Sequence, residues 1–366
     1  MKVIFDCRFT RLGRHDGISR YTAGLVGAFS QLHPVTMLIH DERQLEMLPD
    51  LPWIKARPGH SLLEPFIPLL SLNRHKPDIV FCPMQTIGST GRSGYKLVLT
   101  VHDMVFYRSR KPPVEFSPIV RLLWFLYHVT YWPQRWTLNR AEAVVTGSYN
   151  CEREMIDAKL TKRPLSVIRP GVEELGLAPR AYPVGDPESG KTLVYMGTFM
   201  PNKNVETLAK AMHLLPGYTL RLLSRISTEA RARIEALAPA GSIRFENGVS
   251  DEEYQIALSE ATAMVSACRD EGFGIPLIEG LATGTPLVIS DIPVFHEVGG
   301  DAAVYFDQED PAAFAAAVRS MDHEERWLRL STLATQHAAE FSWEESAKRM
   351  YQLVTGMMEG PAPVVR

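Results

Sequence analysis

With 366 residues, the chain is too long for one ordinary core, and its length predicts about two domains. Hydrophobic residues make up 45% and charged residues 22% of the sequence, a balance that excludes a disordered or fibrous chain. The formal net charge of -3 argues against a general nucleic-acid binder, which needs a basic excess to attract phosphates. We therefore expect no nucleic-acid partner.

The cysteines and the first residues indicate the compartment. Four scattered cysteines without paired spacing favour neither a zinc cluster nor a disulfide framework, and they fit a reducing cytoplasm. The start MKVIFDCRF has too short an apolar run for a secretory signal. No run reaches the roughly 18 to 20 apolar residues that span a bilayer. We expect a cytoplasmic protein, either soluble or bound at the inner face of a membrane.

Short apolar runs alternate with longer amphipathic stretches along the whole chain, which is the pattern of strand–helix–strand units in a parallel sheet. A first series predicts strands at 2–9, 35–39, 78–82, 96–101, 143–147 and 165–168. A second series predicts strands at 192–197, 219–223, 242–246, 263–267, 286–290 and 303–306, with helices such as 251–260 and 311–319 between them. The predicted fold class is α/β, with two Rossmann-like doubly wound parallel-sheet domains that face each other across a cleft.

The two series are separated by a stretch rich in glycine and proline, 171–190. We expect an N-terminal domain at 1–172, a linker at 173–190 and a C-terminal domain at 191–341. A last helix is predicted at 342–366, where Ser342 and Glu345 have the spacing of a capping box, and it is expected to pack back toward the N-terminal domain.

The stretch GDPESGKT, 185–192, has the spacing of a phosphate-binding P-loop. A P-loop follows a buried strand and opens a helix, whereas a proline-containing segment precedes this stretch and a predicted strand follows it. The sequence therefore predicts a linker here and not an ATPase.

Ligands of open α/β sheets bind beyond the carboxyl ends of the strands, and polar or glycine-rich residues follow several predicted strands. Gly17 opens an apolar-faced helix after the first strand, either as an anion site or as a turn that feeds a core helix. His102 directly follows the strand at 96–101. Lys203 lies at a helix start after the strand at 192–197, where its ammonium would either assist anion binding or lie exposed.

The strongest pattern is EGFGIPLIE, which places Glu271 and Glu279 on either side of a glycine-rich helix start. Pro276 is suited to the first turn of that helix, and the free amides there can bind a diphosphate. Carboxylates near phosphates would repel them, so their expected partners are neutral hydroxyl groups. Two carboxylates for hydroxyls and amides for phosphate describe a sugar nucleotide.

At this point the chain resembles the retaining glycosyltransferases of family 4, which have the two-domain GT-B fold. The motifs that carry the resemblance, in the order of the family, are GISRY, VHDM, VIRPGV, YMGTFMPNKN, NGVSDEEYQIALSEA and EGFGIPLIEGLATGTPLVISDIPVFHEVGGDAAVYFD. The resemblance covers nearly the whole chain. It implies an acceptor-binding N-terminal domain and a C-terminal domain that binds a nucleoside-diphosphate sugar.

The resemblance also implies roles for individual residues. It gives His102, Glu271 and Lys203 as catalytic. The implied donor-binding residues are Gly17, Lys203, Arg225, Val249, Glu271, Gly272, Phe273, Gly274, Ile275 and Glu279. Glu279 is similar to the family's ribose ligand, Lys203 to its diphosphate lysine, and Val249 falls where the family holds the base. No metal and no cofactor is expected.

Two places differ from the family's usual pattern. Many members carry a phosphate-binding arginine where this chain has Thr198, and Arg225 is the candidate to replace it. The stretch before Glu271 reads SACRD, where relatives often carry a proline and a serine, so the pocket wall at Ala267 and Cys268 is expected to differ.

The implied reaction transfers a hexose, mannose by first preference, with retention of configuration and without a metal. A front-face route, in which the leaving phosphate helps to deprotonate the acceptor, is implied by the resemblance. UDP-glucose, UDP-N-acetylhexosamine and dTDP-rhamnose are alternative donors. The acceptor is a hydroxyl of a glycan, a lipid-linked molecule or a small molecule, in cell-envelope or polysaccharide biosynthesis.

Two other protein classes are disfavoured by the residues, and one segment has two interpretations. A dehydrogenase is disfavoured because neither RLGRHDG nor GSTGRSG has the dinucleotide-binding spacing. A catalytically silent sugar-nucleotide-binding protein is disfavoured because both glutamates, His102 and Lys203 are present. The aromatic segment 116–136, flanked by Arg110, Lys111, Arg135 and Arg140, predicts a buried core helix, with a peripheral membrane contact through 110–140 as the alternative.

Overall fold

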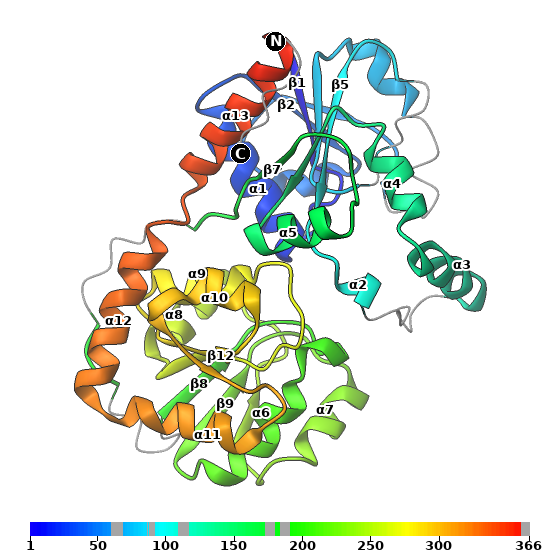
Figure 1. The fold of residues 1–366 in the computed structure, drawn as a ribbon. Coiled ribbons are helices and arrows are strands. Elements are labelled where there is room, and N and C mark those ends of the chain that lie inside the picture. The colour runs from blue at the N-terminus through cyan, green and yellow to red at the C-terminus, as the bar shows by residue number, and fades with distance from the viewer. Residues whose placement is uncertain are drawn as a thin grey trace. The chain divides into compact units, whose positions relative to one another are not determined.

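The structure is a computed structural model that describes residues 1–59, 69–85, 87, 92–108, 117–172, 180–183 and 191–359. It divides the chain into two compact units (Figure 1). The first unit contains Met1–Gly171 together with Ser342–Arg366, and the second contains Val172–Phe341. The end of the chain therefore returns to the first unit.

The first unit is built on a sheet of seven parallel strands. Its strands are β1 (Val3–Asp6), β2 (Val35–Ile39), β3 (Trp53–Lys55), β4 (Ile79–Cys82), β5 (Lys96–Val101), β6 (Ala143–Thr146) and β7 (Leu165–Val167). They lie in the order β3-β2-β1-β4-β5-β6-β7. Every residue of β1, β4 and β6 is buried, as expected for strands covered on both faces.

Most helices of the first unit lie beside the sheet, whereas α3 (Pro118–Val129) stands out from it (Figure 1). The helices are α1 (Gly17–Ser30), α2 (Val105–Arg108), α3 (Pro118–Val129), α4 (Trp132–Leu138), α5 (Tyr149–Asp157) and α13 (Trp343–Glu359). Short 3₁₀ helices, η1 (Glu42–Met47) and η3 (Leu70–His75), follow β2 and β3.

The second unit has a sheet of six parallel strands in the order β10-β9-β8-β11-β12-β13. These strands are β8 (Lys191–Tyr195), β9 (Tyr218–Leu222), β10 (Ile243–Phe245), β11 (Ala263–Ser266), β12 (Leu287–Ser290) and β13 (Ala303–Phe306). Alternate side chains enter different cores: Leu193 and Tyr195 join one apolar cluster, whereas Val194 joins the other. The sheet is therefore covered by apolar residues on both faces.

The helices of the second unit supply those two layers. They are α6 (Val205–Ala211), α7 (Thr228–Glu235), α8 (Asp251–Glu260), α9 (Ile275–Ala282), α10 (Pro293–Gly299), α11 (Pro311–Arg319) and α12 (Glu324–Ala338). A short 3₁₀ helix, η4 (Pro201–Lys203), precedes α6.

The predicted fold class of two Rossmann-like parallel-sheet domains is confirmed. Each predicted strand is present, within a few residues at its ends. Strand β3 was not predicted, because it is a three-residue edge strand whose Trp53 and Lys55 side chains are exposed. The linker of the P-loop-like stretch lies largely outside the described residues, but Lys191 opens strand β8 and not a helix, which excludes a P-loop.

The last helix begins as predicted, with Ser342 as its cap. The Ser342 hydroxyl accepts hydrogen bonds from the amides of Glu344 at 3.1 Å and Glu345 at 3.4 Å. Glu345 itself does not complete the box, since its carboxylate pairs with Arg349 at 3.1 Å. Helix α13 packs along α1, where the Trp343 ring lies 6.0 Å from the ring of Tyr21.

Helix α3 is not the core helix that its composition predicted. Within it only Trp124 is buried. The exposed apolar side chains of the helix are Ile119, Leu122, Leu123, Phe125, Leu126 and Val129. A sequence that is apolar all round does not distinguish a helix inside the protein from one exposed at its surface. Arg110 and Lys111, which were expected beside this helix, lie outside the described residues.

The contact of α1 with α13 makes Gly24 a sensitive position. A Cβ atom at Gly24 would overlap three ring carbons of Trp343. We expect Gly24→Ala to lower the free energy of unfolding by about 1 to 3 kcal/mol, although alanine favours helices, because the indole must move. The measurement is chemical denaturation. The matched control is Gly27→Ala in the same helix, where the nearest atom is Pro49 Cγ at 3.9 Å, and it is expected to stabilise by up to ~1 kcal/mol. Equal stability of the two variants would contradict the packing argument.

Candidate functional site

The candidate site lies where the strand order of the second sheet reverses. Strands β8 and β11 are neighbours, and the chain runs outward from them to β10 on one side and to β13 on the other. In doubly wound sheets the crevice for ligands forms beyond the carboxyl ends of the strands at this switch point. The segment with Lys203 follows β8, and the segment with Glu271 follows β11. Topology therefore brings two residues that are 68 positions apart to one place.

Lys203 and Glu271 form an ion pair, in which the ammonium donates to Glu271 Oε2. Both side chains are about one fifth exposed, so the pair is partly shielded from water yet accessible. The thiol of Cys268 lies 3.5 Å from the same carboxylate oxygen and 3.0 Å from the Asp270 carbonyl. Burial is the main reason that the pKa of Cys268 rises to about 12, so its sulfur is a neutral thiol at pH 7. The side chain of Cys268 beside the ion pair therefore carries no charge.

Further contacts tie the two segments together. The amide of Arg269 donates to the Asn202 carbonyl at 2.7 Å, and the Asn202 side chain donates to the Asp270 carbonyl at 3.1 Å. The Arg269 guanidinium binds the Pro201 carbonyl at 2.8 Å and Glu309 at 2.8 Å. These bonds fix the backbones that carry Lys203 and Glu271, so the position of the pair does not depend on the ion pair alone.

Helix α9 begins inside the glycine-rich segment without a side-chain cap. Its N-cap, Gly274, has φ 95 and, as a glycine, offers no side chain that could accept a hydrogen bond from the first amides. A Cβ at Gly274 would meet Leu277 Cδ1 at 3.1 Å as well as strain the backbone. A helix start of this kind offers amides and the positive end of the helix dipole to an anion. Pro276, the second residue of the helix, has no N–H to contribute.

Glu279 lies in the second turn of the same helix and is held by a neighbour. The Tyr254 hydroxyl from α8 donates to Glu279 Oε2 at 3.0 Å. Phe273 is buried and packs its ring 5.8 Å from that of Phe341, which anchors the segment before α9. Gly272 and Ile275 complete the segment. The two glutamates are thus fixed by different partners.

The segment after β9 and the one after β10 approach each other at Gly248. A Cβ there would lie 2.9 Å from Cγ of Arg225, so the arginine stem crosses the glycine. Val249 follows and packs on the cluster that contains Tyr254 and Phe273. Arg225 is exposed at the same end of the sheet as Lys203. Thr198, which follows β8, is exposed as well.

Gly17 opens α1 in the first unit. Its N-cap, Asp16, accepts from the amide of Ser19 at 2.9 Å and pairs with Arg11 at 2.6 Å. A carboxylate therefore already caps this helix start, which makes the start of α1 a weaker anion site than that of α9.

His102 lies at the carboxyl end of β5, also in the first unit. Its Nε2 donates to the Pro83 carbonyl at 2.6 Å, and its ring contacts that of Tyr21 at 5.2 Å, edge on. Burial lowers the pKa of His102 from its ordinary value of 6.5, although the Pro83 carbonyl and Asp16 act in the opposite direction. The ring is therefore neutral at pH 7, and with the proton on Nε2 its Nδ1 is an acceptor.

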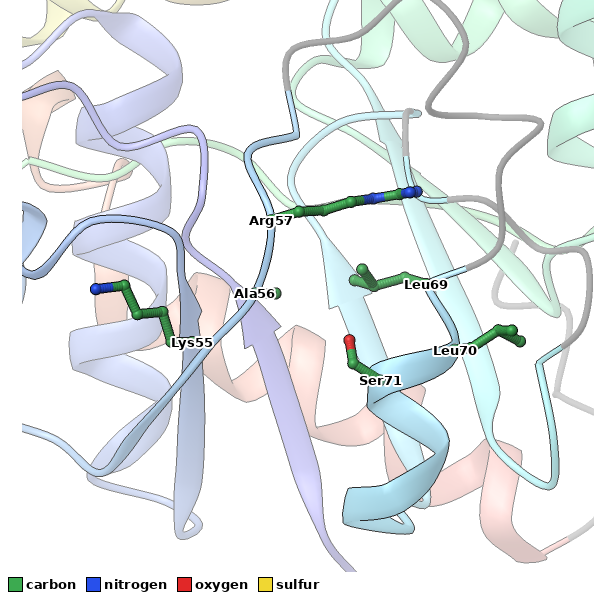
Figure 2. Close-up of a pocket in the computed structure, with 6 residues that line it drawn as sticks. All are labelled: Lys55, Ala56, Arg57, Leu69, Leu70 and Ser71. Carbon is green, nitrogen blue, oxygen red and sulfur yellow. The ribbon is translucent and has the colours of Figure 1, made fainter.

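A pocket of about 480 Å³ lies elsewhere in the first unit, beside β3 and η3. It is lined by Lys55, Ala56, Arg57, Leu69, Leu70 and Ser71. Figure 2 shows Arg57 and Leu69 extending into the space between their segments, while Lys55 and Leu70 point away from it. None of the predicted site residues lines this pocket.

Sequence reasoning found the residues of the ion pair but not the residues that hold them. Asn202, Arg269, Glu309 and Tyr254 were missed, because each acts through contacts between distant segments. Within the part of the chain that the structure describes, no group of three or more His, Cys, Asp or Glu side chains could hold a metal ion. No described helix is both long and apolar enough to cross a bilayer.

Comparison with known proteins gives matches along both units. Residues 15–174 match the family model Glycosyltransferase Family 4, and residues 183–336 match Glycosyl transferases group 1. The O-antigen chain mannosyltransferase RfbU of Salmonella typhimurium is 27% identical over 61% of this chain and 60% of its own. The O-antigen chain mannosyltransferase B of Escherichia coli is 31% identical over 41% of this chain and 42% of its own. The matches thus span about three fifths or less of these two relatives.

Solved structures support the fold over nearly the whole chain. The sucrose-phosphate synthase of Thermosynechococcus elongatus superposes with a TM-score of 0.75 at 18% identity, covering 98% of this chain and 100% of that one. The Anabaena protein HepE in complex with UDP-glucose gives 0.70 at 15% identity, covering 98% and 99%. With two parallel α/β units, these neighbours and matches to both family models, the chain belongs to the family 4 glycosyltransferases of the GT-B fold.

Proposed function

We propose that this protein is a retaining, metal-independent glycosyltransferase that moves a hexose from a nucleoside-diphosphate sugar to a hydroxyl acceptor. The observation that carries the proposal is the Lys203–Glu271 ion pair at the switch point of the second sheet. Glu271 lies in the segment that leads into α9, a helix whose N-cap is a glycine. The acceptor is a glycan, a lipid-linked molecule or a small molecule, in polysaccharide or cell-envelope biosynthesis.

The diphosphate is proposed to bind at the start of α9 and to the Lys203 ammonium. An ammonium has three N–H donors, so Lys203 can keep its bond to Glu271 and still donate to a phosphate oxygen. As the bond to the anomeric carbon breaks, negative charge develops on the leaving diphosphate. Fixed amides and a cation that is already in place stabilise that charge without rearranging, and they need no metal to do so.

The hydroxyls of the donor are proposed to bind the two carboxylates. Glu279, oriented by Tyr254, is assigned to the ribose, and the stretch of Gly248 and Val249 to the base. Glu271 is assigned to the transferred sugar. Arg225, whose stem crosses Gly248, is the proposed second cation in place of the one absent at Thr198. His102 is proposed to bind a hydroxyl of the donor sugar, and Gly17 is proposed to lie near the phosphates.

Mannose is the preferred sugar, with GDP-mannose as the donor. The support is that two relatives are named O-antigen chain mannosyltransferases. The structural neighbour with UDP-glucose supports a UDP-hexose as the alternative. Front-face transfer, with the leaving phosphate accepting the proton of the acceptor hydroxyl, is the proposed route to retention.

The ion pair provides the first test. We expect Lys203→Ala and Glu271→Ala each to lower kcat/KM by at least about a hundredfold, because one loses the cation for the leaving group and the other the grip on the sugar. Radiolabelled transfer from GDP-mannose, UDP-glucose and dTDP-rhamnose measures this. The matched controls are Lys210→Ala and Glu252→Ala, both exposed side chains of the same unit. Near-normal rates in either site variant, with folding verified by thermal melting, would reject its role.

A thermal-shift screen with GDP, UDP and dTDP tests donor binding separately from transfer. A ligand at 100 times its Kd stabilises the folded state by about 2.7 kcal/mol, so the preferred base is identified by the largest rise in Tm. We expect Glu279→Ala to remove most of that rise and Tyr254→Phe to reduce it, whereas Glu252→Ala leaves it unchanged. A rise that is the same in all three variants would show that Glu279 does not contact the nucleotide.

His102 gives a prediction on pH. Its folded-state pKa lies below 6.5 because burial disfavours the charged ring. Between the folded and unfolded pKa values the unfolded chain binds the extra proton, so stability is retained above 6.5 and decreases as the pH falls through that range. Protonation also removes the acceptor at Nδ1, and kcat/KM should fall over the same range. NMR titration of the His102 Cε1 proton measures the pKa directly, and a value above 6.5 would contradict the prediction.

A further inference from the structure

The outward face of α3 is apolar and exposed. Six of its twelve residues, Ile119, Leu122, Leu123, Phe125, Leu126 and Val129, are between 38% and 73% exposed. At 100° per residue these six positions lie within an arc of about 160° around the helix axis. Soluble proteins seldom expose a contiguous apolar surface of this kind, and such surfaces mark contacts with proteins or membranes.

The opposite face of α3 is attached to the first unit by aromatic packing. Trp124 lies 5.2 Å from the ring of Phe106 on α2, and His128, one turn further along α3, lies 5.2 Å from the ring of Tyr107 on α2. Figure 1 shows the helix standing out from the strands of its unit. Leucines on the outer side of such a helix add nothing to the core that the described residues form, so their presence needs another explanation.

The segments next to α3 are basic. Residues 117–141 and 158–163 contain Arg121, Arg135, Arg140, Lys159, Lys162 and Arg163 and no Asp or Glu, in a chain whose net charge is -3. Glu142 and Asp157 lie directly beside these ranges, and Glu142 is paired with Arg92 at 2.5 Å. The two segments are joined: Arg135 donates to the carbonyls of Ala158 at 2.6 Å and Lys159 at 3.0 Å, and Arg163 donates to the Asn139 carbonyl at 2.8 Å. We call these six cations the basic strip.

Aromatic residues are concentrated in α3 and in the segment after it, which also contains part of the basic strip. Three of the six tryptophans of the chain, Trp124, Trp132 and Trp136, fall within thirteen residues. Trp132 opens α4 and is 68% exposed, and Arg140 lies 4.1 Å from the ring centre of Trp136. Tryptophan with arginine is the combination typical of the boundary between lipid headgroups and acyl chains.

A lipid surface fits these features better than a second copy of the chain. A symmetric contact between two copies would bury the apolar faces but would bring two basic strips of the same sign together, which is unfavourable. An anionic bilayer accepts both the leucines and the cations. Twelve residues of helix measure about 18 Å, which is too short to span a hydrocarbon core of about 30 Å, so the helix would lie within one interface.

We propose that the outward face of α3, with Trp132 and the basic strip, is a docking surface for an anionic lipid bilayer. The proposal deepens the proposed function, on which its purpose rests: a transferase docked in this way takes a lipid-linked acceptor from the membrane surface. Docking itself follows from the surface and not from the transfer reaction.

The test is flotation of the full chain with vesicles of phosphatidylcholine, with and without phosphatidylglycerol. We expect binding to the anionic vesicles that weakens with added salt. Leu122→Glu with Leu126→Glu should lower the partition coefficient at least about tenfold, because two inserted leucines are replaced by charges. The control is Leu328→Glu on α12, another exposed leucine, which should bind like the unaltered chain.

Three outcomes would overturn the proposal: no binding to anionic vesicles, equal binding by the double variant, or a dimer in the absence of lipid that the double variant dissociates. Light scattering on a sizing column measures the last of these. The nucleoside-diphosphate thermal shift is run on the same samples. If the double variant keeps that shift but loses the vesicles, both proposals are supported. If the chain lacks the shift, the proposed function fails by itself.

Discussion

All strands in both sheets run parallel, and this constraint decides where a site can form. Parallel strands place all their carboxyl ends on one edge, and crossover helices cover both faces with apolar residues. With apolar residues covering the faces, a site for a polar ligand is expected at that edge. The order of the strands then selects one point on it, between β8 and β11, where two successive connections leave in opposite directions. The proximity of Lys203 and Glu271 follows from this topology.

The charges at that point are balanced before any donor binds. Lys203 offsets Glu271, while Arg269 and Glu309 offset each other on the backbone that carries them. A diphosphate bound as proposed would meet Lys203, the start of α9 and a carboxylate already engaged by that lysine, so the repulsion of the diphosphate by Glu271 is reduced. Because the surrounding hydrogen bonds hold the two segments, the pair would not need to be rebuilt for a phosphate to bind as proposed. The neutral thiol of Cys268 adds no further charge to this balance.

The strands of both sheets could be predicted because buried parallel strands consist of short runs of Val, Ile and Leu. Strand β3 was missed because two of its three side chains are exposed. The sequence also singled out Lys203, Glu271 and Glu279 as candidates, since each lies close to the end of a strand or the start of a helix, and their roles stay predictions. It did not predict that Lys203 and Glu271 pair, or that Tyr254 holds Glu279, because such contacts depend on tertiary packing. The sequence near a residue indicates which chemical groups are present, but it does not indicate which distant residues those groups will contact.

Helix α3 is the clearest case in which the sequence alone does not determine what a segment packs against. Its apolar composition is compatible with burial in a core and with exposure, and the position of Trp124 against Phe106 of α2 is what distinguishes them. Once that face is turned inward, helical geometry forces the leucines outward, next to a segment with cations and no acidic residue. An apolar face that adds nothing to the described core, beside charges of a single sign, fits a surface with an apolar interior and an anionic exterior better than it fits a second copy of the chain. A lipid leaflet has both properties in the same order.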